Sequence, residues 1–114
     1  TAVMLPQGIA GTEVIARAYR RYNLSLGGGL SKVAGKLFRI GHLGDMNEVH
    51  LMAAINGAEM AMLDCGVALQ PGSGSAAAGN YWRQHAAPSG LGAPVFNKDE
   101  HAKHSLSGQA VVKG

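Results

Sequence analysis

The sequence predicts an α+β domain in which helices cover one face of a small, three-stranded antiparallel or mixed sheet. Three observations lead to this expectation. The expected element order is strand, helix, strand, strand, helix, helix; the strand-like runs are short and end at glycine or proline; and the clearest helices carry an apolar stripe along one side. The length of 114 residues and the ordinary apolar content indicate a single domain with a core of its own.

The first half of the chain contains three expected strands and one helix. Residues 2–5 form a strand-like run that Pro6 ends, and the residues alternate again at 23–26, before three glycines. A third strand is expected at 37–42. Between the first two, residues 13–22 have a helical pattern, with one apolar face made of Ile15, Ala18, Tyr19 and Tyr22.

The second half begins with a long amphipathic helix, expected at 46–63. Asp45 is a suitable N-cap residue, and Glu48 three positions later completes a capping-box pattern. Gly66 is expected to end the helix as its C′ residue. The apolar stripe is rich in methionine, which is typical of core packing, and consists of Leu51, Ile55, Ala58 and Met62, widened by Met52, Met60 and Leu63.

A weaker helical pattern at 76–87 surrounds Tyr81 and Trp82. From Pro88 onward the composition changes to proline, glycine, serine, lysine and histidine with scattered apolar residues. We therefore expect a domain at 1–87 and a tail of uncertain order at 88–114. Because residues 1–5 already resemble a strand, we also expect the sequence to be a piece of a longer protein.

The composition argues against several classes of partner. The net charge of +3 is mild and the cations are scattered among acids, so nucleic acid binding is not expected. No apolar run is long enough to span a membrane. Cys65 is the only cysteine, which excludes an internal disulfide and favours a reducing, cytoplasmic location. In its apolar helix pattern, Cys65 is expected to pack as a small hydrophobe rather than to react.

Arg39 is the candidate binding residue. It lies within a strand-like run, and Gly41 and Gly44 break that run directly afterwards. A guanidinium in such a place needs a partner, and a carboxylate matches its geometry best. That carboxylate could belong to a ligand, or to an acid of the same domain such as Asp45 or Glu48 in a structural salt bridge.

No other residues form a recognisable site. The glycine-rich loop fails as a phosphate-binding loop because Leu30 and Leu37 stand where glycine and serine or threonine are required. His101 and His104 have helical spacing but no third ligand, and His42 beside Arg39 is expected to be satisfied by backbone hydrogen bonds. We therefore expect no metal site and no catalytic residue within this chain.

Two runs carry a family resemblance: YNLSLGGGL at 22–30 and VAGKLFRIGHLGDMNE at 33–48. They resemble the small C-terminal domain of serine–glyoxylate aminotransferases, a branch of the class V, fold-type I pyridoxal-phosphate enzymes with alanine–glyoxylate and serine–pyruvate relatives. The resemblance extends over roughly residues 1–85, and the segment FRIGHLGD is specific for this branch.

The resemblance implies a homodimeric enzyme that moves an amino group from serine or alanine to glyoxylate on pyridoxal 5′-phosphate. A large domain absent from this chain would bind the cofactor and supply the Schiff-base lysine, so the 114-residue piece alone would be inactive. Arg39 matches the arginine that binds the substrate α-carboxylate, whereas Gly41 and Gly44 would make the turn and Asp45 would cap the helix. The competing hypothesis is a stand-alone carboxylate-binding or interaction module without catalysis.

Overall fold

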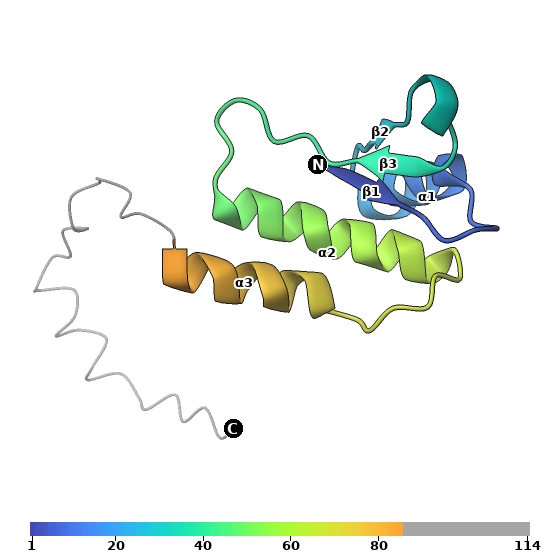
Figure 1. The fold of residues 1–114 in the computed structure, drawn as a ribbon. Coiled ribbons are helices and arrows are strands. Elements are labelled where there is room, and N and C mark those ends of the chain that lie inside the picture. Colours follow the sequence, from blue (N-terminus) through green and yellow to red (C-terminus); the bar gives the residue numbers. More distant parts are fainter. Residues whose placement is uncertain (86–114) are drawn as a thin grey trace, which may run out of the picture.

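The computed structural model describes residues 1–85 of the chain (Figure 1). The expected boundary at 87 and the tail at 88–114, with His101 and His104, lie outside the described residues. In chain order the elements are β1 (Ala2–Met4), α1 (Gly11–Tyr22), β2 (Gly27–Gly28), the 3-10 turn η1 (Ser31–Val33), β3 (Leu37–Arg39), α2 (Glu48–Asp64) and α3 (Ser73–His85).

The three strands form one antiparallel sheet in the order β1-β3-β2, so β3 is central. Phe38 lies opposite Val3 on one side and Gly28 on the other, and Arg39 lies opposite Ala2 and Gly27. Because side chains alternate along a strand, Phe38 and Arg39 point to opposite faces of the sheet. The α+β class with a three-stranded sheet is therefore confirmed.

The helices lie on one side of the sheet in successive layers, α1 against the strands, α2 against α1 and α3 along α2 (Figure 1). Phe38, with no exposed surface, points to the helical side, as does Ile40, whereas Arg39 is exposed on the other face. The core between the sheet and the first two helices consists of Val14, Ala18, Leu26, Phe38, Ile40, Ala54, Ala58 and Ala61.

The second strand was predicted at the wrong residues. It forms at Gly27–Gly28 rather than at 23–26. Asn23 has a left-handed backbone (φ 53°) and ends α1, and the N–H of Leu24 still donates to the Ala18 carbonyl. Residues 23–26 therefore carry the chain out of the helix, and the alternating pattern there reflects Leu24 and Leu26 packing against the core.

The face predicted for α1 is correct at Ala18 but wrong at Tyr19, which is 64% exposed. The buried residues of this helix are Gly11, Val14 and Ala18. A Cβ on Gly11 would lie 2.7 Å from the Leu37 carbonyl oxygen, so the helix crosses β3 with no room for a side chain. Ile15 and Tyr22 of the predicted face are partly buried and pack against the core.

The N-cap of α2 is Asn47, not Asp45. The Asn47 side chain accepts the N–H of His50 at 3.0 Å, and His50 Nδ1 accepts the Asn47 N–H at 3.4 Å. The capping box is therefore Asn47 with His50, two residues later than predicted, and Glu48 is the first helical residue. The predicted C′ residue is confirmed: Gly66 has φ 85°, and two backbone bonds after α2 give a Schellman motif.

The buried positions of α2 are mostly small, and Met60 of the predicted stripe is 42% exposed. Ala54, Ala58 and Ala61 join the core with α1, and a Cβ on Gly57 would lie 2.7 Å from Leu24 Cδ2. On another side, α2 lies along α3 (Figure 1), where Ile55 and Met52 lie next to Gly74 and Gly79 of α3. Within residues 1–85, every helix is too short or too polar to cross a bilayer.

The last helix begins at Ser73, three residues before the predicted start. The buried carboxylate of Glu59 on α2 explains this start, because it accepts the N–H groups of Gly72, at 3.0 Å, and of Gly74. A carboxylate at a helix N-terminus satisfies N–H groups that have no partner inside the helix and complements the helix dipole.

Candidate functional site

Arg39 is the last residue of the central strand and is exposed on the face of the sheet opposite the helices. Its two cross-strand neighbours, Ala2 and Gly27, are small, so space remains beside the side chain. Arg39 Nε donates a hydrogen bond to the Gly28 carbonyl at 2.8 Å. No carboxylate within residues 1–85 pairs with it, and a salt bridge to Asp45 or Glu48 does not form.

Arg39 lines a cleft of about 560 Å³ at one end of the sheet. Its lining residues are Thr1, Ser25, Leu26, Gly27, Arg39, Ile40, Gly41, His42 and Leu43. The lining contains no acid, so within the described part of the chain Arg39 gives the cleft an uncompensated positive charge. Such a cleft favours an anion, and a carboxylate can accept two parallel hydrogen bonds from a guanidinium.

His42 lines the same cleft, and its Nε2 lies 3.1 Å from the main-chain nitrogen of Thr1 and 3.2 Å from Thr1 Oγ1. It also borders a smaller, mainly apolar cavity of about 300 Å³ with Leu51, Ile55 and Trp82. The part of the chain that the structure describes contains no cluster of potential metal ligands. His42 is thus a polar wall of the Arg39 cleft.

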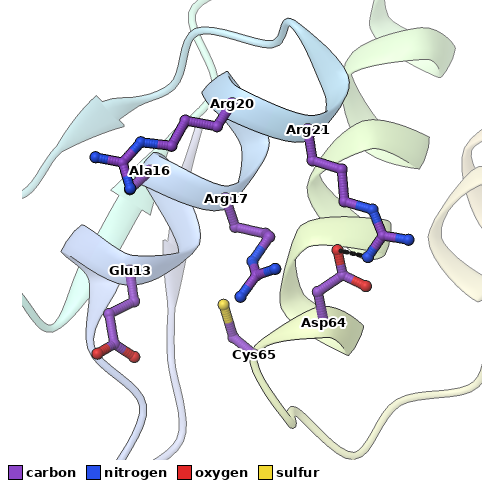
Figure 2. Close-up of a pocket in the computed structure, with 7 residues that line it drawn as sticks. All are labelled: Glu13, Ala16, Arg17, Arg20, Arg21, Asp64 and Cys65. Atoms are coloured by element: carbon purple, nitrogen blue, oxygen red, sulfur yellow. Dashed lines mark ion pairs between the residues drawn. The ribbon is translucent and has the colours of Figure 1, made fainter.

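A larger cleft of about 760 Å³ lies between α1 and the C-terminal end of α2 (Figure 2). Here Arg21 pairs with Asp64 at 2.8 Å, and the Tyr22 hydroxyl donates to the same carboxylate at 2.7 Å. The hydrogen bond from Tyr22, helped by the charge of Arg21, lowers the pKa of Asp64, and the same bond raises the pKa of Tyr22. The Asp64 carboxylate is thus paired with both Arg21 and Tyr22. We therefore interpret this cleft as a structural contact between the two helices.

Two further residues of that cleft agree with this interpretation. Arg17 points toward Cys65 in Figure 2, between the two helices. Cys65 is partly buried and packs against the core, as the sequence predicted. The lining also contains Glu13 and Asp64 beside its three arginines, whereas the lining of the Arg39 cleft contains no acid.

The Arg39 cleft does not fit pyridoxal phosphate as a complete site. A Schiff base needs a lysine, and neither Lys32 nor Lys36, the two lysines among residues 1–85, lines the cleft. Both are exposed, Lys32 within η1 and Lys36 directly before β3. Among the lining residues of the cleft, Arg39 is the one whose side chain matches the geometry of a carboxylate, and no lysine is present to form a Schiff base.

The sequence predicted the place of Arg39 in a strand, but it did not reveal the residues that surround its side chain. The contribution of Gly28 is a backbone carbonyl, which any residue type provides, so the sequence holds no signal for it. The role of Glu59 was missed because its acceptor function depends on where α3 begins. The sequence does contain a signal for this role, because an acid on a buried face of a helix requires hydrogen-bonding partners.

No family model matches the chain. The chain is 56% identical over 85 residues to serine–glyoxylate aminotransferase of Methylorubrum extorquens and 55% identical over 85 residues to that of Arabidopsis thaliana. It is 42% identical over 84 residues to an L-aspartate–glyoxylate aminotransferase of Paracoccus denitrificans. The first two matches cover 75% of this chain and 21% of each relative.

The fold agrees with these sequence matches. A ureidoglycine–glyoxylate aminotransferase from Bacillus subtilis superimposes with a TM-score of 0.67 at 24% identity, over 73% of this chain and 22% of that structure. The predicted resemblance is therefore confirmed by sequence and by fold. Over three quarters of its length, this chain is homologous to serine–glyoxylate aminotransferases, and it spans about a fifth of the length of those enzymes.

Proposed function

We propose that this chain forms the C-terminal small domain of an aminotransferase that moves an amino group from serine or alanine to glyoxylate, and that Arg39 binds the substrate carboxylate. The observation that supports the proposal is the environment of the Arg39 side chain. Its guanidinium is exposed in a cleft lined by no acid, and no acid of residues 1–85 pairs with it. It also lies in the FRIGHLGD segment that carries the resemblance.

The guanidinium would act by orientation. Two parallel hydrogen bonds to a carboxylate fix both the position and the rotation of an amino acid, whereas an ammonium would fix only the position. Because amino and oxo acids share the α-carboxylate, one arginine would serve both the donor and the acceptor. Correct orientation matters for rate, since misplacing a reacting group by about 1 Å can cost on the order of 100-fold.

The remaining functions belong to parts outside this chain. Pyridoxal 5′-phosphate, its Schiff-base lysine and the contacts to its phosphate would come from the large domain, and the complete enzyme would be a homodimer. The donor is the least constrained part of the proposal, because the relatives are named for serine and for L-aspartate. The 114-residue chain alone should not catalyse transamination.

The proposal is tested in a complete enzyme, either the full polypeptide that carries this chain or a chimera in which it replaces the homologous part of the Methylorubrum extorquens protein. Arg39→Lys should raise the apparent KM for serine and lower kcat/KM by about 10-fold or more, because one of two charge-assisted hydrogen bonds is lost. The measurement is steady-state serine–glyoxylate transamination.

Arg20→Lys is the matched control, because Arg20 is also exposed but lines the other cleft. It should leave kcat/KM unchanged. An unchanged kcat/KM in Arg39→Lys would remove the assigned role of this arginine.

A further inference from the structure

We infer that Gly27 and Gly28 are positioning residues for Arg39: the Gly28 carbonyl orients the guanidinium through Nε, and the missing side chain of Gly27 provides its space. The inference rests on the proposed function, because it assigns a ligand-binding purpose to the orientation of Arg39. It adds a direction of approach for the carboxylate and two residues that determine this direction.

The hydrogen bond from Nε to Gly28 limits how a ligand can bind. A carboxylate can meet a guanidinium side-on, through Nε and one terminal nitrogen, or end-on, through both terminal nitrogens. Nε already donates to the Gly28 carbonyl at 2.8 Å, and it carries only one N–H. The end-on approach through the two terminal nitrogens therefore remains, and it directs the carboxylate along the axis of the Arg39 side chain.

Gly27 lies directly opposite Arg39 in the sheet, so its missing side chain would be on the same face. A Cβ at Gly27 would lie 3.4 Å from both Cβ and Nε of Arg39 and 3.6 Å from Nη2. These are ordinary contact distances, so a single methyl group fits. A β-branched side chain would extend from that methyl into the space of the guanidinium and would displace it.

Gly28 faces the other side of the sheet and is therefore a natural comparison. A Cβ there would lie 3.8 Å from Ile15 Cδ1 on α1 and would not approach Arg39. Neither Gly27 nor Gly28 has the positive φ that favours glycine. Backbone conformation therefore does not require glycine at these positions, and the need at Gly27 is for side-chain space.

The first experiment is NMR spectroscopy of the Arg39 Nε–H group in the 114-residue chain. We expect slower hydrogen exchange for this group than for the exposed Arg20 Nε–H, because it is hydrogen-bonded. Gly27→Val should abolish the difference, while Gly27→Ala and Gly28→Ala should preserve it. If the wild-type Arg39 Nε–H exchanges as fast as that of Arg20, the inference is overturned without any reference to activity.

The second experiment measures serine–glyoxylate transamination by the same variants in the complete enzyme. Gly27→Val should raise the KM for serine by about tenfold with a smaller change in kcat, because one charge-assisted hydrogen bond orients the arginine. Gly27→Ala and Gly28→Ala should stay within about twofold of wild type. A Gly27→Val enzyme with wild-type KM would overturn the inference.

The variants separate this inference from the proposed function. If Arg39→Lys impairs the enzyme and Gly27→Val does not, the positioning role fails and the carboxylate role of Arg39 stands. If Arg39→Lys is also harmless, the proposed role of Arg39 fails. Should Gly27→Val not fold, Gly27→Thr tests the same β-branched shape with a hydroxyl in place of one methyl group. The exchange rate of the wild-type Arg39 Nε–H still tests whether the hydrogen bond to Gly28 orients the guanidinium.

Discussion

Two arginines of this domain show how neighbouring residues determine what a charged side chain does. Arg21 pairs with Asp64 at 2.8 Å at the ends of α1 and α2, so its charge contributes to the fold. Arg39 pairs with no acid among residues 1–85, and its Nε contacts only a backbone carbonyl. Because both residues have the same side-chain chemistry, only their surroundings distinguish the arginine of a structural ion pair from the arginine that has no acidic partner among the described residues.

The Tyr22–Asp64 contact predicts how stability depends on pH. The hydrogen bond from Tyr22, together with Arg21, lowers the pKa of Asp64 below its usual value of 3.8. Asp64 therefore stabilises the folded state above pH 3.8, and this contribution disappears as the pH falls through the lowered pKa. The pKa of Tyr22 is raised above 10.0, mainly by the same hydrogen bond, so its contribution is lost as the pH rises through that raised value.

Urea unfolding of the wild type and of Asp64→Asn measures this effect. The wild type should be more stable at pH 7, and the difference should shrink as the pH falls below 3.8. Asp45→Asn is the control, since Asp45 is exposed and pairs with no cation within residues 1–85. A stability difference that is the same at pH 7 and at the acid end would contradict the prediction.

At the scale of elements, periodicity predicted which helices and strands exist, but local contacts decided where they begin. Leu24 and Leu26 resemble a strand in sequence because they alternate, yet they pack against the core while the adjoining glycines pair with β3. A strand forms where its backbone pairs with a neighbouring strand. The strand propensity of residues 23–26 therefore could not show that Gly27 and Gly28 would be the residues that pair. Arg39 was predictable as a strand-end cation, whereas its contact with the Gly28 carbonyl was not.

The start of α2 allows a direct comparison of the predicted and observed caps. Asn47→Ala should lower the free energy of unfolding by about 1 kcal/mol, because the His50 N–H loses its acceptor. Asp45→Ala should change it by less than about 0.5 kcal/mol, as expected for an exposed residue outside the helix. Urea denaturation measures both values. The reverse order of effects would restore Asp45 as the cap.

The attachment of α3 depends on Glu59, a buried acid on α2 with only 7% of its surface exposed. Its carboxylate accepts N–H groups at the start of α3, and Ser75 Oγ adds a bond to Asn56 at 2.9 Å. Glu59→Gln removes the charge and replaces one acceptor with a donor. The expected loss is roughly 1–3 kcal/mol, the cost of leaving buried polar groups unsatisfied.

Trp82 provides the measurement for this variant, because it is the only tryptophan of the chain and lies half-buried on α3. In Glu59→Gln its fluorescence transition should come at lower urea concentration than in the wild type. Glu48→Gln is the matched control, since Glu48 is exposed in the first turn of α2. Equal midpoints for the wild type and Glu59→Gln would show that Glu59 does not secure α3.

At the scale of the whole molecule, two large apolar side chains lie exposed in the segment before α2 and in its first turn. Leu43 borders the cleft and is 92% exposed, and Val49 on the first turn of α2 is 73% exposed. In Figure 1 the segment between β3 and α2 extends away from the layers of the domain. Leu43 therefore adds to the border of the Arg39 cleft an apolar surface of the kind that contacts another part of a protein.

The final prediction separates a catalytic assembly from a stand-alone binding module. The purified 114-residue chain, mixed with serine, glyoxylate and pyridoxal 5′-phosphate, should form no glycine above a protein-free control, because the Arg39 cleft contains no lysine among its described lining residues. The chimera with the Methylorubrum extorquens large domain should form glycine, and Arg39→Lys should weaken that activity. Glycine production by the isolated chain would contradict the proposal that the large domain supplies the cofactor and its lysine while this chain binds the substrate carboxylate. Saturable binding of serine by the isolated chain, lost in Arg39→Lys and paired with an inactive chimera, would instead favour the module.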